Sequence, residues 1–338
     1  MAEKKSSLAD IASAVGLSVS VVSRVLRQEM GKTRVNEANM AKIREVAREM
    51  NYIPSYLTRD SWAKQSKNIG IIFSELNNPF HYEILNFFDE YAQSRGYHII
   101  MSNTHHDESN EFDRAQMFLA YMTTGIVVMP SSKNSQRRII EHHKGDDANR
   151  IVYFGISYYE KCNYSILELD SDVENLVKEL HQRGYTKIGF IGSSETPFDG
   201  RDRYRAYLKA LKQLGLQSDY SININDSKPF MANKEEVYAQ MSSYIKTSRE
   251  FAEVYIAYND IIALGGMQAF KDAGKSIPKD VGFVTVDNTL ETRAGKTPMS
   301  SLVYDYKKMV SDSIEAIIQS KPLKQHMRAE IAWRASTR

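Results

Sequence analysis

The stretch from Leu8 to Arg27, LADIASAVGLSVSVVSRVLR, constrains the fold of this chain more than any other. Ser7, with Asp10 three residues later, has the form of a capping box, which satisfies free backbone amides at a helix start. Apolar residues then recur at helical spacing as far as Gly16, a residue that readily adopts the left-handed conformation of a helix end. The pattern predicts a first short helix that ends in a tight glycine turn.

A second short helix is predicted directly after this turn. Ser18 is a suitable N-cap, and the apolar residues Val21, Val22, Val25 and Leu26 fall on one face of the helix. The outward face then carries Val19, Ser20, Ser23, Arg24 and Arg27. Two short helices joined in this way predict a helix-turn-helix that reads the major groove of DNA. An ordinary helical hairpin at a domain edge is the alternative for these twenty residues taken alone.

The residues that follow favour the DNA-binding interpretation. A third helix is predicted to open at Val35-Asn36 and to close at Asn51-Tyr52-Ile53-Pro54, because proline disfavours helix in the residue before it. With V-S-R-V inside the second helix and N-Y-I-P after the third, the chain resembles the LacI/GalR family of bacterial transcription repressors. The resemblance covers nearly the whole chain and implies a DNA-binding regulator.

Charge and cysteine content agree with this resemblance. Residues 1–67 hold 12 Lys/Arg and 7 Asp/Glu, whereas the remainder holds 32 and 35, so the basic excess lies at the end that would meet phosphates. Cys162 is the only cysteine, which excludes an intrachain disulfide. No signal core and no run approaching about 18 apolar residues are present, so we expect a cytoplasmic protein with no membrane partner.

Enzyme and cofactor motifs are missing from the sequence. It contains no G-x-S-x-G, no P-loop G-K-S/T and no G-x-G-x-x-G after a strand. The neighbouring pairs His105-His106 and His142-His143 point different ways on regular structure and are not predicted as metal ligands. We therefore expect no catalytic residues, no metal and no cofactor.

From Ile69 onward, short apolar runs alternate with amphipathic stretches, which predicts an α/β fold with parallel sheets covered on both faces. A first series of strands is expected at 69–73, 98–102, 125–129 and 151–155. A second series is expected at 187–191, 221–225, 254–258 and 281–286, with helices near 172–183, 200–214, 234–247 and 260–273. Two consecutive series predict two doubly wound lobes.

The resemblance implies the architecture of periplasmic sugar-binding proteins, with a ligand between the lobes. It divides the chain into a helix-turn-helix domain (1–54), a hinge (55–67) and an effector-binding and dimerisation core (68–338). After Pro298, the strand SSLVY and a helix at 306–319 are expected to join the first lobe, and the final run AEIAWRAST the second. The first lobe is thus expected over about 68–166 and 302–323, and the second over about 167–301 and 324–338.

In the family, bases are read at positions that fall on Val19 and Ser20, with Arg24 one turn further; Arg hydrogen-bonds guanine bidentately. The family's hinge carries A-x-x-L, whose Leu wedges into the minor groove. Here Ser61 replaces that Leu, so either Trp62 is the wedge, or the hinge binds differently, or Trp62 packs on the body. The full set of predicted DNA-binding residues is Leu8, Ser18, Val19, Ser20, Ser23, Arg24, Arg27, Asn36, Tyr52, Ser55, Arg59 and Trp62.

Residues at strand ends supply the predicted effector site. The motif Asn78-Pro79-Phe80-His81, the arginine of RYRAYLKAL, Asn259-Asp260 and Asp287-Asn288 match family positions, and Phe230 matches a stacking aromatic more weakly. Alternatives remain open: Asn259 only caps a helix, or Phe80 only fills the lobe interface. The predicted effector-binding residues are Phe80, His81, Arg203, Phe230, Asn259 and Asp287.

One departure from the family concerns the effector. The family's effector-binding acid falls at Gly155, so the ligand is an unusual sugar, something other than a sugar, or absent. The resemblance implies a homodimer on a pseudopalindromic operator, most simply a repressor of carbohydrate-related genes whose DNA affinity a small molecule sets. A family regulator without an effector and a solute-binding or sensing protein are the rival hypotheses, and activation instead of repression stays open.

Overall fold

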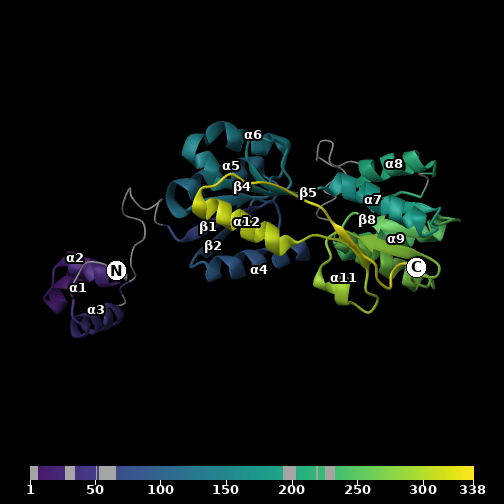
Figure 1. Cartoon of the computed structure of the whole chain (residues 1–338). Coiled ribbons are helices and arrows are strands. Elements are labelled where there is room, and N and C mark those ends of the chain that lie inside the picture. Colours follow the sequence, from purple (N-terminus) through teal and green to yellow (C-terminus); the bar gives the residue numbers. More distant parts are fainter. Residues whose placement is uncertain are drawn as a thin grey trace. The chain divides into compact units, whose positions relative to one another are not determined.

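The structure, a computed structural model, describes residues 7–26, 35–50, 52, 66–192, 203–217, 220–224 and 233–338 (Figure 1). The chain divides into two compact units, Met1–Asp60 and Ser61–Arg338. The first unit contains three helices among its described residues: α1 (Leu8–Val15), α2 (Val19–Leu26) and α3 (Glu37–Glu49). This agrees with the three helices expected from the sequence.

A small apolar core holds these three helices together. Ile11 on α1, Val22 and Val25 on α2, and Ile43 on α3 are almost completely buried against one another. They are the residues that the helical spacing of apolar positions placed on the inner faces. Burial of these side chains is what orients the short α2 on the other two helices.

The first lobe of the second unit is a six-stranded sheet in the order β11-β5-β4-β3-β1-β2, all parallel. Helices α4 and α12 pack on one face of this sheet and α5 and α6 on the other, as the two buried clusters show. Its elements are β1 (Asn68–Phe73), α4 (Pro79–Ser94), β2 (His98–Asn103), α5 (Glu108–Met117), the π-helix η1 (Phe118–Met122), β3 (Gly125–Val128), α6 (Lys133–His142), the 3-10 helix η2 (Gly145–Arg150), β4 (Ile151–Gly155), β5 (Asn163–Leu167), α12 (Tyr306–Gln319) and β11 (Lys324–Met327).

The second lobe repeats the plan with the order β12-β10-β9-β8-β6-β7, in which only β12 is antiparallel to its neighbour among the described pairs. Helices α7 and α8 cover one face and α9 and α10 the other. Its elements are α7 (Leu169–Gln182), β6 (Ile188–Gly192), α8 (Arg203–Leu214), β7 (Ile222–Asn223), α9 (Lys234–Thr247), β8 (Val254–Ala257), α10 (Asp260–Asp272), β9 (Gly282–Thr285), α11 (Leu290–Ala294), β10 (Ser300–Val303) and β12 (Glu330–Ala332).

The expected α/β class and the two doubly wound lobes are confirmed, but the late crossover differs from the expectation. Strand β10, which was placed in the first lobe, pairs with β9 in the second sheet. Strand β11, which was placed in the second lobe, pairs with β5 in the first sheet. The reason is physical: the half-exposed KQHM of β11 has no apolar run that would mark it as a strand.

Close packing of α9 on α10 depends on the glycine pair Gly265-Gly266. A Cβ on Gly265 would lie 2.9 Å from the Lys234 carbonyl oxygen and 2.8 Å from Val237 Cβ, whereas one on Gly266 would meet only side-chain atoms, at 3.3 Å or more. At either position, replacing Gly with Ala favours the helical conformation by about 1 kcal/mol through intrinsic helix propensity. We expect Gly265→Ala to lower the free energy of unfolding by about 1–3 kcal/mol through overpacking, and Gly266→Ala to change it far less.

Urea unfolding of the two variants side by side measures this difference. Equal stability of both variants would contradict the close approach of the two helices.

Candidate functional site

The structure confirms the predicted start and end of α1. The Ser7 hydroxyl accepts from the Asp10 amide at 3.2 Å, and the Asp10 carboxylate accepts from the Ser7 amide at 2.7 Å, which completes the capping box. Gly16 ends the helix with φ +70°, the left-handed region that favours glycine. The chain bends by 107° between α1 and α2.

The outward face of α2 presents the residues predicted to read bases. The side chains of Ser20 and Arg24 are exposed, Val19 is 45% exposed, and Ser23 is half-buried. Because Val22 and Val25 anchor the opposite face in the core, these four side chains lie together on the free side of the helix. This arrangement is the one a recognition helix requires.

The remaining predicted DNA-binding residues divide into three groups. Ser18 accepts from the Val21 amide at 3.4 Å, and Asn36 caps α3 by accepting from the Asn39 amide at 2.8 Å, so both also serve as helix caps. Leu8 and Tyr52 are half-buried and pack on the core of the three helices. Four further positions lie outside the described residues: Arg27, Ser55, Arg59 and Trp62.

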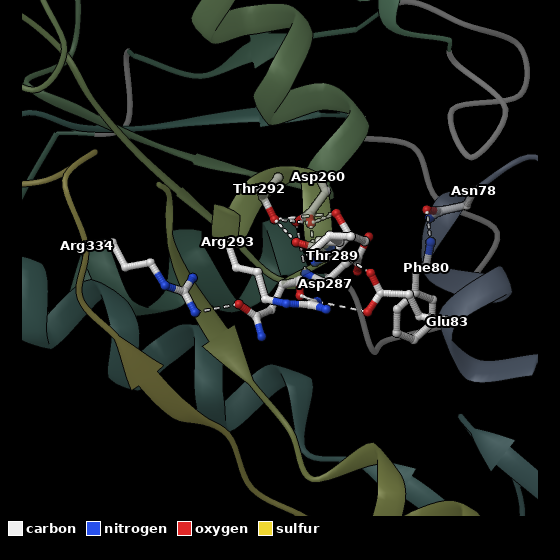
Figure 2. A network of polar contacts seen from close by, with 11 residues as sticks. Asn78, Phe80, Glu83, Asp260, Asp287, Thr289, Thr292, Arg293 and Arg334 are labelled. Carbon is white, nitrogen blue, oxygen red and sulfur yellow. Dashed lines mark hydrogen bonds and ion pairs between the residues drawn. The ribbon is translucent and has the colours of Figure 1, made fainter. Parts of the chain in front are cut away.

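The dominant polar group between the two lobes is Asp260, the first residue of α10. Its carboxylate is buried and accepts five hydrogen bonds from the segment that runs from the end of β9 into α11 (Figure 2). The donors are Thr285 Oγ1 at 2.5 Å, the Asp287 amide at 3.2 Å, the Thr289 amide at 2.7 Å, and the hydroxyls of Thr289 and Thr292, each at 2.6 Å. The neighbouring Asn259, and not Asp260, was the residue predicted from the sequence. The Asn259 side chain is the N-cap of α10 and accepts a hydrogen bond from the Ile262 amide at 2.9 Å.

Asp287 is the buried, incompletely paired carboxylate of the site. Its Oδ2 has no hydrogen-bond partner among the described residues, while the neighbouring Asn78 side chain of the first lobe works to lower the pKa of the carboxylate. Burial and the nearby Asp260 charge raise the pKa of Asp287 to about 7, and Arg203 opposes this rise. A carboxylate in this state is ready to accept a hydrogen bond from a bound hydroxyl or amine.

Arg203, at the start of α8, faces the same carboxylate. Its guanidinium donates to the Tyr258 carbonyl oxygen and lies 4.5 Å from the centre of the Tyr258 ring. Burial disfavours the guanidinium charge, but the facing Tyr258 and Asp287 raise the pKa of Arg203 above its ordinary value. Arg203 therefore places its positive charge within electrostatic range of the Asp287 carboxylate.

Aromatic rings form a wall beside this pair. The Phe80 ring contacts the Tyr306 ring edge-on with centroids 5.0 Å apart, and Tyr304 lies 5.8 Å from Tyr306. The Phe80 ring also lies 5.5 Å from the imidazole of His81, whose pKa is lowered by burial. Tyr304 and Tyr306 were not predicted as site residues. The signal available in the sequence was that both aromatic residues closely follow the strand SSLV.

A contact from the first lobe closes the site at one side. The Glu83 carboxylate on α4 accepts from the Leu290 amide at 2.6 Å and from Arg293 Nη1 at 2.9 Å, both on α11 (Figure 2). Arg293 also donates to the carbonyl oxygen of Asn288, which has φ +54°. Glu83 therefore ties α4 to the segment that Asp260 organises.

Two cavities lie between the lobes. One of about 340 Å³ is lined by residues that include Asn78, Lys234 and Asp260. The other, of about 270 Å³, is lined by residues that include Phe80 and Asp287. Both volumes are in the range of small-molecule sites.

Two further positions that the sequence singled out for the effector site are Gly155 and Phe230. Gly155, which stands where the family has its effector-binding acid, ends β4 with φ +78°, a backbone conformation that favours glycine. A Cβ at this position would meet no neighbouring atom, so the backbone conformation and not lack of space favours glycine here. Phe230 lies outside the described residues. Among the part of the chain that the structure describes, no three His, Cys, Asp or Glu side chains are grouped to hold a metal ion.

Comparison with known proteins places both units. Residues 7–55 match the family described as bacterial regulatory proteins, lacI family, and residues 177–337 match the periplasmic binding protein-like domain. The HTH-type transcriptional repressor PurR of Actinobacillus pleuropneumoniae serotype 3 (strain JL03) is 24% identical over 87% of this chain and 84% of its own length. The HTH-type transcriptional regulator RegA of Clostridium saccharobutylicum is 27% identical over 82% and 81%.

Solved structures share the whole fold. A LacI family transcriptional regulator from Silicibacter pomeroyi aligns with a TM-score of 0.82 at 17% identity over 98% of this chain and all of its own. The lac repressor dimer bound to operator and the anti-inducer ONPF aligns with a TM-score of 0.78 at 19% identity over 99% of each chain. A complex of the transcriptional regulator CelR with cellobiose gives 0.64 at 17% identity over 98% of this chain and 99% of its own.

A helix-turn-helix unit followed by a two-lobed, periplasmic-binding-protein-like core defines a DNA-binding transcription regulator. The matched residues 7–55 belong to the lacI family of bacterial regulatory proteins, and the chain resembles regulators of that family along most of its length. The relatives named here are regulators and not enzymes, in agreement with the expectation from the sequence. Among the described residues, no single helix has the length and apolar composition to cross a membrane; α1 and α2 meet those criteria only as a bent pair.

The raised pKa of Asp287 predicts a pH dependence of stability. The folded-state pKa of about 7 lies above the ordinary value of about 3.9, so the folded chain binds the proton more tightly. The free energy of unfolding should therefore fall as the pH rises from about 4 to about 7. Asp287→Asn should remove on the order of 1–3 kcal/mol of this fall.

Urea unfolding at pH 5 and pH 8 tests the effect, with Asp113→Asn, an exposed carboxylate on α5, as the control. A wild-type and an Asp287→Asn chain with the same pH dependence would contradict the burial of an ionisable Asp287.

Proposed function

We propose that this regulator represses transcription, most simply of carbohydrate-related genes, by binding a pseudopalindromic operator as a homodimer in the bacterial cytoplasm. A small molecule held between the lobes sets its affinity for the operator. The proposal assigns DNA reading to a head of residues 1–54, coupling to a hinge of 55–67 and ligand binding to a core of 68–338. One observation carries it: a buried, incompletely paired Asp287 facing Arg203, in the same chain as an anchored recognition helix.

DNA reading is assigned to the exposed side of α2. Arg24 is suited to a bidentate contact with guanine, and Val19 to the methyl group of thymine. Ser18, Ser23 and the amides at helix starts are suited to phosphates, which position the helix without reading sequence. The structure of the lac repressor dimer on its operator supports the assignment of a dimer, because that relative shares the fold. Two heads related by dimer symmetry would meet half-sites about one helical turn apart.

Ligand binding is assigned to the space beside Asp287, Arg203 and the aromatic wall. A carboxylate and a guanidinium bind neighbouring hydroxyl groups, and ring faces pack on the apolar face of a sugar or a base. The CelR–cellobiose complex supports a sugar, and the likeness to PurR repressors supports a broader panel. Gly155 removes one acceptor, so the ligand differs in its hydroxyl pattern from one that requires that acid.

Arg24→Ala tests the DNA assignment. We expect it to lower operator affinity by roughly 1–3 kcal/mol and to relax the sequence preference at one base pair of each half-site. Arg48→Ala is the matched control, because Arg48 is likewise an exposed arginine but belongs to α3 instead of α2. Binding-site selection with wild type and both variants measures the preference. The same consensus from wild type and Arg24→Ala would refute the base contact.

A thermal-shift screen with sugars, nucleobases and sugar phosphates tests the ligand assignment. A ligand at 100 times its dissociation constant should stabilise the fold by about 2.7 kcal/mol. Arg203→Met should abolish the shift, while Arg205→Met, which removes an exposed arginine two residues along α8, should retain it. Silence of the wild-type chain across the panel would favour a family regulator without an effector.

A further inference from the structure

The chain passes between the two lobes three times among the described residues. The crossing segments are residues 167–169 between β5 and α7, residues 304–305 between β10 and α12, and residues 328–329 between β11 and β12. Hinge motions of two-lobed proteins are absorbed by backbone rotations in a few such residues. Contacts that join the crossing segments to one another therefore decide how freely the lobes turn.

One carboxylate joins the start of α7, which directly follows the first crossing segment, to the third crossing segment. Asp172 lies in the first turn of α7, directly after the first segment, and its side chain is 3% exposed. Its Oδ1 accepts from Arg328 Nε at 2.8 Å and its Oδ2 from the Ala329 amide at 2.9 Å, both in the third segment. The Tyr304 hydroxyl, in the second segment, lies within electrostatic range of this carboxylate but makes no hydrogen bond among the described residues.

A second contact joins the first segment to the end of β11, directly before the third segment. The Glu168 amide donates to the Met327 carbonyl oxygen at 2.9 Å, and the Glu168 carboxylate contacts His326 Nδ1. The His326 Nε2 lies 3.0 Å from the Tyr164 hydroxyl on β5. These contacts hold the first segment beside the end of β11.

Breaking the Asp172 contacts is costly for a physical reason. A buried carboxylate that loses its partners keeps its desolvation penalty and regains no water. A rotation of the lobes that separates Ala329 or Arg328 from Asp172 therefore works against that penalty. Arg328 itself is 62% exposed, so the buried member of the pair is the one that constrains the hinge.

We propose that Asp172 is the hinge pin of the core: its carboxylate, at the start of α7, holds the third crossing segment in one geometry beside the first and so biases the lobes toward one arrangement. The consequence for DNA binding rests on the proposed function, in which the arrangement of the lobes sets operator affinity.

The test measures the distance between the lobes in the full chain. Spin labels are placed on the exposed positions Glu141 of α6 and Gln213 of α8, each changed to Cys in a Cys162→Ser background. Asp172→Ala and Asp172→Asn should shift or broaden the distance distribution and change operator affinity by about 5-fold or more. Glu174→Gln is the matched control, because Glu174 on α7 pairs at 2.5 Å with Lys209 inside the second lobe.

Each outcome decides the proposal. An unchanged distance distribution in folded Asp172 variants overturns the hinge pin. A changed distribution with wild-type operator affinity supports the hinge pin and contradicts the proposed coupling to DNA. If Asp172→Ala does not fold, Asp172→Asn and Arg328→Met carry the test, since each removes the ion pair and leaves an acceptor for the Ala329 amide.

Discussion

The geometry between the lobes depends on the buried carboxylate of Asp260. Five donors from the segment between β9 and α11 converge on its two oxygens, so this segment has one conformation in which its polar groups are satisfied. That conformation places Asp287 between the lobes and presents the first amide of α11 to Glu83 on α4. Removing the Asp260 carboxylate would leave several buried donors unpaired, which is among the costly changes that a fold can undergo.

The rest of the site follows from this constraint and from the sheet topology. Parallel strands bring their carboxyl ends to one edge of each sheet, so the loops after β1, β8 and β9 supply Asn78, Asn259 and Asp287 to the same region. Because residues of both lobes line the two cavities, a molecule bound there would touch both lobes. A ligand that binds one arrangement of the lobes better than another shifts the population toward it.

The positions of most helices and strands were predictable from local sequence patterns, whereas the contacts between distant segments were not. Apolar runs located the central strands β1, β3, β4, β6, β8 and β9, and capping residues located α1 and α3, because those signals lie within a few residues. Strand β11 was placed in the wrong lobe because its polar sequence carries no such signal. The roles of Asp260 and Asp172 depend on partners 25 to 157 residues away, which no local pattern records. Arg203 and Asp287 were found through resemblance, whereas Tyr304 and Tyr306 required the fold.

Operator affinity is the most direct measure of the proposed coupling between ligand binding in the core and DNA binding by the helix-turn-helix unit. The selected operator is titrated with the full chain, with and without a saturating amount of whichever compound most stabilises the fold. We expect operator affinity to change by about 5- to 150-fold, and the operator to change the affinity for the compound by the same factor. Equal operator affinity with and without the compound would contradict this coupling.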